Sequence, residues 1–339
     1  MPPTTYRKIV LQRHSYSLSE ALTIEEEPLR ETMPNELLLR NLYVGINYPD
    51  IAAITGFNPA YEHLPQDLGL EALAEVVAVG SDVQDMAVGD YVIAAFFGNG
   101  FREYNVIDAF FTIKIPTLNL DYLALLLSAC NAYIGLHYIL RLTGKETVLI
   151  TSAVANSGYY MAQFAQAIGC KVTACCLTTS EAQQLQSLGL TRLIVREEED
   201  LDAVLSAEYP YGFDFIFDEL GGQVLTTAIH HIAPKGKVLV SNLFSEYLDE
   251  TQQPELSFDI LYQIVSKSAI FYGFNLTEYA HLIPEVYTLL RNSYESGQIK
   301  VLCDPTPFEG LEGIIEAMQH IIEYRQCGKV IVRLDPSHG

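Results

Sequence analysis

The segment from residue 147 to residue 171 constrains the fold of this chain more than any other. It begins with an apolar run, Val148 to Ile150, of the kind that forms a buried parallel strand. Small residues follow as far as Gly158, and apolar residues then recur at helical spacing up to Gly169, which is suited to ending a helix. Another apolar run, 172–176, completes a strand–turn–helix–strand unit. The turn of such a unit offers backbone N–H groups and a helix dipole to an anion, usually a dinucleotide pyrophosphate.

This turn is poor in glycine. Ala155 and Asn156 stand where a dinucleotide-binding turn favours glycines, and after Ser157 only Gly158 remains. Asn adopts positive φ more readily than other non-glycine residues, but each missing glycine costs on the order of 1 kcal/mol if the turn needs the left-handed region. We take these four residues as candidate phosphate contacts. The alternative is an α/β core unit that binds no ligand.

Composition restricts the class of protein. With 339 residues, the chain is long enough for two domains with substantial cores, and 49% hydrophobic with 18% charged residues is typical of an ordered globular protein. A net charge of −22 argues against nucleic acid or an anionic membrane as partner. We identify no apolar run near the ~20 residues that span a bilayer and no signal-peptide core at the N-terminus. The six cysteines lack metal-ligand spacing, so we expect reduced thiols in a cytoplasmic protein.

The order of predicted elements divides the chain into three segments. Residues 1–122 contain many short strands with Gly-rich turns, which is typical of a twisted, barrel-like β domain. Residues 123–275 begin with helical patterns and then alternate strands with helices, which predicts a doubly wound parallel sheet. Residues 276–339 contain two helical patterns and a final strand at 329–334, and we expect this piece to return to the first domain.

Short motifs in a fixed order resemble the medium-chain dehydrogenase/reductase superfamily, in its zinc-independent quinone oxidoreductase and prostaglandin reductase branch. The resemblance spans nearly the whole chain and implies an α/β fold: a GroES-like twisted β-barrel domain plus a doubly wound Rossmann domain. The matching segments are 45–50, 69–80, 88–92, 101–104, 128–133, 218–222, 235–237, 272–274 and 328–330.

The resemblance implies an NADPH-dependent reductase of carbon–carbon double bonds that are activated by a carbonyl group. Hydride passes from the nicotinamide to the β-carbon of an enone or quinone, without a metal. Alcohol-oxidising relatives bind zinc through a Cys and a His at positions that here hold Asn47 and Leu70. Because zinc requires converging N or S ligands, we expect no zinc.

The end of the second strand of the Rossmann unit bears on the choice between NAD and NADP. An NAD enzyme usually has Asp or Glu there to bind the ribose hydroxyls, whereas this chain has Cys176, Leu177 and Thr178. Thr178 offers a hydroxyl, and Arg192 or Arg196 is able to pair with a 2′-phosphate. The simpler interpretation of both arginines is a solvated strand end, and we favour Arg196 as the phosphate contact.

The resemblance also implies cofactor contacts at positions where this chain departs from the family. Asn131 replaces a Thr, Gln326 replaces an Asn, and Asn242 stands where relatives have Gly. Further implied contacts are Asn47, Leu220 and Phe274. Since several positions have changed together, either NADPH is kept with altered contacts, or the site has lost the cofactor. In the latter case the protein is a non-redox enzyme, such as a cyclase or isomerase, or a binding protein.

For the substrate, the cleft between the domains is the default site. A group of aromatic residues suggests a small apolar or aromatic substrate, although any single one is more simply explained as a core or surface residue: Tyr48, Phe57, Tyr61, Tyr262 and Phe274. We consider Tyr48 as the catalytic residue, because its hydroxyl is suited to stabilise a developing enolate. The family commonly forms homodimers through an edge strand of the Rossmann sheet, and segments 237–244 and 264–274 are candidates for that edge.

Overall fold

The computed structural model describes residues 2–95, 98–251 and 258–335. The chain divides into two compact units. The first comprises Met1–Leu127 and Val301–Gly339, and the second comprises Ser128–Lys300. The sequence assigns residues 276–300 to the segment that returns to the first domain, whereas the structure groups them with the second unit.

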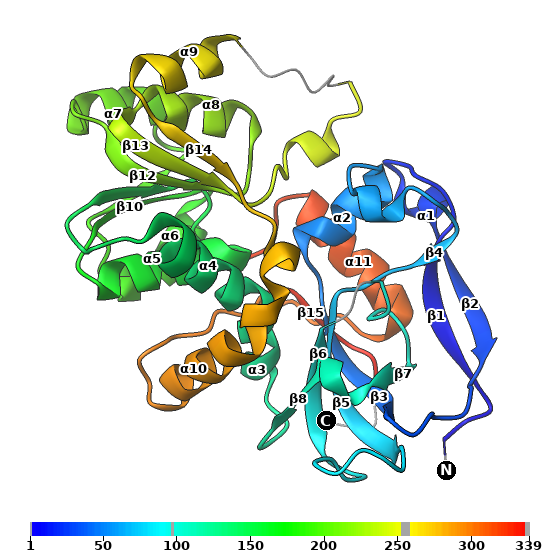
Figure 1. Ribbon diagram of the computed structural model, residues 1–339. Helices are drawn as coiled ribbons and strands as arrows, with labels where there is room; N and C mark the ends of the chain where they lie inside the picture. Colours follow the sequence, from blue (N-terminus) through cyan, green and yellow to red (C-terminus); the bar gives the residue numbers. More distant parts are fainter. Residues whose placement is uncertain (1, 96–97, 252–257, 336–339) are drawn as a thin grey trace. The chain divides into compact units, whose positions relative to one another are not determined.

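Antiparallel strands form the first unit (Figure 1). One sheet has the order β2-β1-β4, and a larger sheet has the order β15-β3-β5-β6-β8, with β7 also paired to β3. The central strand β3 is buried along most of its length, as its run of leucines predicts. The strands are β1 (Thr5–Leu11), β2 (Leu22–Pro28), β3 (Glu36–Gly45), β4 (Gln66–Asp67), β5 (Glu71–Val79), β6 (Tyr91–Ala95), β7 (Tyr104–Asp108), β8 (Thr112–Ile115) and β15 (Ile331–Arg333).

Strand β2 was not predicted from the sequence. Its residues 25–27 are three consecutive glutamates, and most of the strand faces solvent. A strand at the edge of a sheet with little apolar surface lacks the alternation on which sequence-based assignment relies. It is recognisable only through its pairing with β1.

Few helices belong to the first unit. The helix α2 begins with a capping box, in which the Asn47 side chain and the N3 residue Asp50 bind each other's backbone N–H groups. It ends at Gly56, whose φ of +88° favours glycine. The helical segments are α1 (Leu18–Ala21), α2 (Tyr48–Thr55), η1 (Pro59–Tyr61), η2 (Ala109–Phe111), α3 (Leu120–Ala124) and α11 (Gly310–Ile322).

The second unit contains a six-stranded sheet with the order β11-β10-β9-β12-β13-β14. All its strand pairs are parallel, which confirms the predicted doubly wound sheet. The strands are β9 (Thr147–Ile150), β10 (Lys171–Cys176), β11 (Arg192–Val195), β12 (Phe213–Asp218), β13 (Ile232–Val240) and β14 (Ile270–Gly273). Since β13 lies between β12 and β14, the prediction of segment 237–244 as a sheet edge is wrong. The other candidate, 264–274, contains β14, which is an edge strand together with β11.

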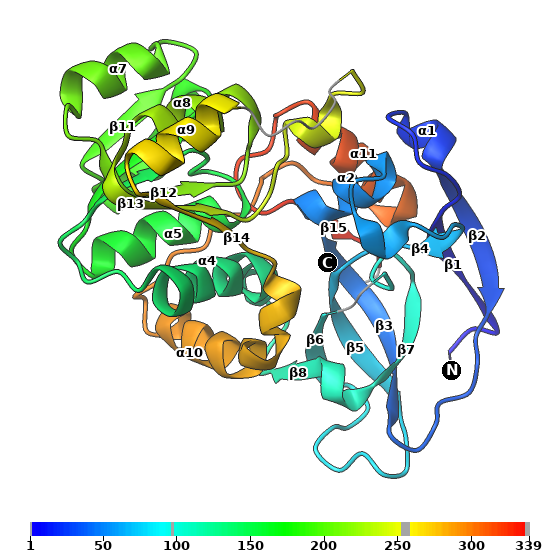
Figure 2. The ribbon, with the colours of Figure 1, turned by 45° about the horizontal axis from the view of Figure 1, so that its top comes forward.

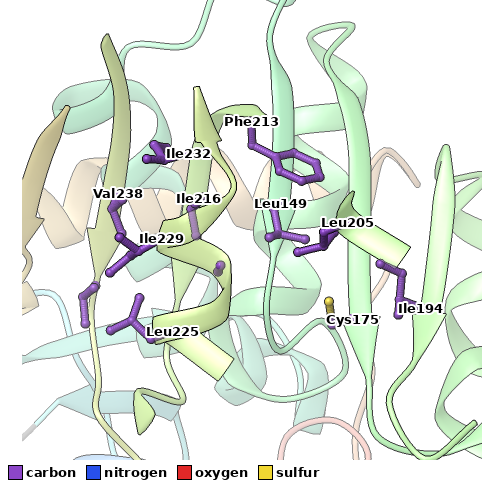
Figure 3. Packing of buried hydrophobic residues seen from close by; sticks show 12 residues of the cluster. Leu149, Cys175, Ile194, Leu205, Phe213, Ile216, Leu225, Ile229, Ile232 and Val238 are labelled. Carbon is purple, nitrogen blue, oxygen red and sulfur yellow. The ribbon is translucent and has the colours of Figure 1, made fainter. Parts of the chain in front are cut away.

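Helices cover both faces of this sheet. Figures 1 and 2 show α7, α8 and α9 on one face and α4 and α5 on the other. Figure 3 shows part of the core, where Leu205 of α7 and Ile229 of α8 pack on Leu149 and Ile216 of the sheet. The helical segments are η3 (Leu125–Ala129), α4 (Cys130–Ile134), η4 (Gly135–Leu140), α5 (Asn156–Ala167), α6 (Thr179–Leu185), η5 (Gln186–Leu188), α7 (Leu201–Glu208), α8 (Gly222–His230), η6 (Glu246–Leu248), α9 (Phe258–Ser266), η7 (Leu276–Leu282) and α10 (Ile283–Glu295).

One helical segment is longer and more apolar than the sequence indicates. The two helical patterns predicted at 122–128 and 132–142 join into one segment, Leu120–Leu140, of 21 residues with a mean hydropathy of 1.6. The expectation that no apolar run approaches the length of a membrane span is therefore wrong. By length and composition alone this segment fits a bilayer, but 72% of its most apolar window is buried in the structure. Burial of that extent equally describes a core helix.

Candidate active site

The turn between β9 and α5 is not strained at the position of the first missing glycine. Ala155 is the N-cap of α5 and has extended backbone, with φ −112° and ψ 146°. This region of φ/ψ space is open to any residue, so alanine here costs none of the strain that the sequence suggested. Asn156 begins the helix, and its side chain lies outside the described part of the structure.

Position 158 requires glycine because the backbone of Ser152 lies directly against it. A Cβ atom at this position would lie 1.6 Å from the carbonyl oxygen of Ser152. The residue thus allows the first turn of α5 to pack directly on the segment that follows β9, which is one of the roles that glycine has in dinucleotide-binding turns.

A buried carboxylate occupies the N-terminal end of α5. Glu219 directly follows β12 and is 1% exposed. Its Oε2 accepts a hydrogen bond of 3.1 Å from the Gly158 N–H, and its Oε1 accepts one of 3.2 Å from the Ser241 hydroxyl. The Ser157 hydroxyl is a further partner. Burial raises the pKa of Glu219 to about 7, against the opposing effect of these hydrogen bonds.

Asn131 completes this polar cluster. Its Nδ2 donates to the Ser157 hydroxyl at 2.7 Å and lies 3.4 Å from the Ser241 hydroxyl. The structure therefore brings together three of the predicted cofactor contacts, Asn131, Ser157 and Gly158, and adds Glu219 and Ser241, which sequence reasoning missed. The available signal was their position at the carboxyl ends of β12 and β13, where parallel sheets place their binding residues.

The ends of β10 and β11 carry the residues predicted to bind a 2′-phosphate. Thr178 is the N-cap of α6, and its hydroxyl accepts a hydrogen bond of 3.2 Å from the Glu181 N–H. Arg196 directly follows β11, and its Nε is buried without a hydrogen-bond partner among the described residues. Its charge acts on the neighbouring carboxyl of Glu181.

Arg192 differs from Arg196 because its guanidinium is paired with two carboxylates. Its guanidinium forms ion pairs with Glu199 and, at 3.1 Å, with Glu208. These bonds raise the pKa of Arg192, and they hold the side chain along β11 and α7. Arg192 therefore has a structural role, and Arg196 is the arginine with donor capacity left for a ligand.

The remaining predicted contacts of the second unit lie near the ends of β12, β13 and β14. Leu220 is 5% exposed, and its carbonyl oxygen accepts bonds from the backbone and the hydroxyl of Ser245. Asn242 is partly buried just after β13. Phe274 is 5% exposed, with its ring edge-to-face against Tyr279.

Asn47 and Gln326 belong to the first unit, where their partners are residues of that unit. Lys329 Nζ lies 2.6 Å from Asn47 Oδ1 and 2.5 Å from Glu71 Oε1, and Asn47 Nδ2 donates to the same Glu71 oxygen. Gln326 Nε2 donates to the Tyr48 hydroxyl at 2.5 Å. The amide of Asn47, at the position of a zinc-binding Cys in metal-dependent relatives, is thus engaged by a buried ion pair.

No group of three or more His, Cys, Asp or Glu side chains suited to a metal ion occurs in the described residues. Asp50 contacts the cluster of Asn47, Glu71 and Lys329 through the Asn47 N–H. It is 1% exposed, and burial raises its pKa to about 7. The groups around Asn47 are therefore its own amide, the carboxyl groups of Glu71 and Asp50, and the ammonium group of Lys329. An ammonium group repels a cation, so this set is poorly suited to bind zinc.

The aromatic residues predicted to bind substrate fall into two sets. In the first unit, Tyr48 and Tyr61 are 2% and 6% exposed, and Phe57 is partly buried. In the second unit, Phe274 is buried, whereas Tyr262 on α9 is 57% exposed and stacks on Phe258. The burial of Tyr48 is what a core tyrosine shows, and its catalytic role stays a prediction.

Comparisons with known proteins agree with this architecture. Residues 33–117 match the alcohol dehydrogenase GroES-like domain family, and residues 158–291 match the zinc-binding dehydrogenase family. The chain is 30% identical to prostaglandin reductase-3 of Mus musculus, over 98% of the chain and 90% of that protein. It is 27% identical to a probable quinone oxidoreductase of Leishmania amazonensis, over 98% of the chain and 99% of that protein.

Solved structures confirm the predicted fold class. The structure of CurA in complex with NADPH from Vibrio vulnificus matches with a TM-score of 0.83 at 20% sequence identity. The match covers 97% of this chain and 99% of CurA. A GroES-like domain and a Rossmann-type parallel sheet are therefore both present in this chain.

Proposed function

Because this chain belongs to the medium-chain dehydrogenase/reductase superfamily, in its zinc-independent quinone oxidoreductase and prostaglandin reductase branch, we propose that it reduces carbonyl-activated C=C bonds with NADPH. The substrate class we propose is a small apolar enone or quinone. In this reaction NADPH, when bound, supplies a hydride to the β-carbon of the substrate. The names of the matched reductase and quinone oxidoreductase support this proposal.

The choice of NADPH over NADH rests on one observation: Nε of Arg196 is buried without a hydrogen-bond partner among the described residues. A buried guanidinium nitrogen without a partner is costly unless a ligand satisfies it, and the guanidinium is the side chain best suited to a phosphate group. Thr178, at the end of the neighbouring strand β10, begins α6. In a doubly wound fold the residues at this place face the adenosine ribose. A 2′-phosphate there would pair with Arg196, and the residues of the chain fit this end of the cofactor.

Replacing Arg196 by alanine is expected to weaken NADPH binding about 10- to 100-fold, since hydrogen bonds to a charged group contribute about 1.5–3 kcal/mol. NADH binding should change little, because NADH lacks the 2′-phosphate. The measurement is a fluorescence titration of each nucleotide, followed by NADPH oxidation with a panel of enones and quinones.

The matched control is Arg192→Ala, which removes the same charge from the opposite end of β11. Because Arg192 is paired with Glu199 and Glu208, this variant should keep the wild-type preference for NADPH over NADH even if it is less stable. Equal affinity of the wild type for the two nucleotides would contradict the cofactor assignment. Absence of NADPH oxidation with every acceptor in the panel would contradict the redox function.

A second candidate function is a non-redox reaction, such as a cyclisation or isomerisation, or a binding role. It is favoured by one specific observation: the N-terminus of α5, where a pyrophosphate would bind, already has a carboxylate partner in Glu219. Turnover that continues after all nicotinamide nucleotide has been removed would support this alternative.

We further propose that the protein is a homodimer formed through β14. This strand lies at the edge of the sheet, where no strand of the described residues pairs with its outer side, so a second copy could pair there. Exposed apolar side chains lie along it and on α9, which precedes it: Phe258, Leu261, Tyr262, Val265, Ile270 and Phe271. Pairing of two such edges would bury them.

Replacing Phe271 by glutamate is expected to convert this dimer to a monomer, because the charge would be placed in the apolar contact of both copies. Sedimentation or light scattering should give twice the chain mass of 37.8 kDa for the wild type and a single chain mass for the variant. Leu289→Glu is the control, since Leu289 is 43% exposed on α10. A monomeric wild type at micromolar concentration would rule out the dimer.

A further inference from the structure

The N-terminal end of α5, where we expect the pyrophosphate to bind, already contacts the carboxylate of Glu219. Glu219 accepts a hydrogen bond from Gly158, in the first turn of the 12-residue helix α5. In that place a carboxylate uses the positive end of the helix dipole in the same way as a bound anion does. Since Glu219 is 1% exposed, its charge is not screened by solvent.

The groups that face Glu219 supply no positive charge. Ser157 on α5, Ser241 after β13 and the neighbouring Asp218 interact with it directly. Asn131 on α4 binds both serine hydroxyls, and Glu246 on η6 acts on Asp218. No Lys or Arg forms an ion pair with Glu219 within residues 2–95, 98–251 and 258–335. The surroundings therefore consist of neutral donors and two further carboxyl groups.

A dinucleotide pyrophosphate carries two negative charges at neutral pH. Like charges at close range in a buried site disfavour each other strongly, and the weaker acid responds by binding a proton. We propose, on the basis of the function proposed above, that Glu219 must be protonated for the pyrophosphate of NADPH to bind at α5. Binding then converts the Glu219 carboxylate and one proton from solvent into a neutral carboxyl group, which offers its own O–H to a phosphate oxygen. The Gly158 N–H loses its bond to Glu219 and keeps its bond of 3.2 Å to the Ala155 carbonyl oxygen.

The direction of the pH dependence follows from this linkage. Burial already holds the pKa of free Glu219 near neutrality, and a bound pyrophosphate would raise it further. The affinity for NADPH is therefore greatest at pH values below the pKa of free Glu219, and it falls as the pH rises through that pKa. Above that pKa, affinity is expected to fall about tenfold for each pH unit.

The test measures NADPH binding between pH 7 and 9 by calorimetry in buffers that differ in ionisation enthalpy. The wild type should take up close to one proton per NADPH at the upper end of this range, and its dissociation constant should rise with pH. Glu219→Gln keeps the shape of the side chain without the charge, so it should take up about one proton fewer per NADPH than the wild type, while the neighbouring Asp218, whose pKa burial also raises to about 7, is present in both proteins. At pH 8.5 this variant should bind at least about tenfold more tightly than the wild type.

Two controls separate this effect from others. Glu246→Gln removes a nearby acidic charge that does not contact α5, and it should keep the proton uptake of the wild type. Adenosine 2′-monophosphate reaches the Arg196 end but lacks a pyrophosphate, so its affinity should be the same for the wild type and Glu219→Gln. Because proton uptake is measured on the wild type itself, the test does not depend on the stability of the variant.

The outcomes are distinct. NADPH binding without proton uptake, with equal affinity in the wild type and Glu219→Gln, would overturn the role of Glu219 and leave the reductase proposal intact. If the Glu219→Gln variant bound NADPH and the wild type did not, the Glu219 charge would be shown to prevent binding, which supports the inference. If neither protein bound NADPH at any pH while both remained folded, the proposed function itself would fail, and the inference with it.

Discussion

Replacing Lys329 by methionine is expected to lower the free energy of unfolding by about 3–5 kcal/mol, the usual effect of removing one partner from a buried ion pair. Lys329 and Glu71 are 2% and 0% exposed, and their charged atoms lie 2.5 Å apart. Lys329 also donates to the carbonyl oxygen of Ile46 and to Asn47. Methionine fills a similar volume but leaves the Glu71 carboxylate buried without a counter-charge. Urea unfolding, followed by a probe in the first unit, measures the change.

The control is the double variant Lys329→Met/Glu71→Gln, in which neither charge remains. If the cost of the single variant arises from the uncompensated carboxylate, the double variant should recover a large part of the lost stability. Glu71 Oε2 has no hydrogen-bond partner among the described residues, so the neutral amide loses few contacts. A loss below about 1 kcal/mol in the single variant would show that the Glu71 carboxylate does not depend on Lys329 for its stability.

Replacing Gly158 by alanine is expected to destabilise the second unit strongly. The added Cβ would meet the Ser152 carbonyl oxygen at 1.6 Å, and a backbone atom cannot move away by changing a rotamer. The first turn of α5 would have to separate from the segment after β9, and its bond to Glu219 would be lost with it. We expect a loss of about 3 kcal/mol or more in stability, together with a loss of nucleotide binding.

Gly273→Ala is the matched control for this substitution. Apart from the two chain neighbours of Gly273, no atom of the described residues lies within 4 Å of a Cβ built there, so the same one-methyl change should alter stability by no more than about 0.5 kcal/mol. Thermal and urea unfolding of the two variants side by side make the comparison. Similar stability of the Gly158 variant and the wild type would show that α5 is held less closely than the structure indicates.

Local patterns in the sequence were sufficient for the architecture of the second unit. Apolar runs separated by helical periodicity predicted its parallel sheet, because a buried parallel strand needs apolar side chains on both faces. The same reasoning failed for β2, whose three glutamates show no such pattern, and for Leu120–Leu140, where two patterns join into one helical segment. It also left two candidates for the sheet edge, 237–244 and 264–274, of which only the second contains an edge strand, because a sequence does not show which strand lacks an outer neighbour.

The sequence by itself determined the fold class and the family, since both rest on the order of patterns and motifs along the chain, and it located the turn at Gly158, which rests on one short segment. Only the tertiary structure showed that Glu219 binds the helix after that turn from 61 residues away. It also showed that Arg192 is paired with two glutamates, whereas Nε of Arg196 is buried without a hydrogen-bond partner among the described residues, and that Lys329 neutralises Glu71. The physical reason is common to the three cases. The protonation and the availability of a side chain depend on the burial and charge of its neighbours, and folding brings those neighbours from distant parts of the chain.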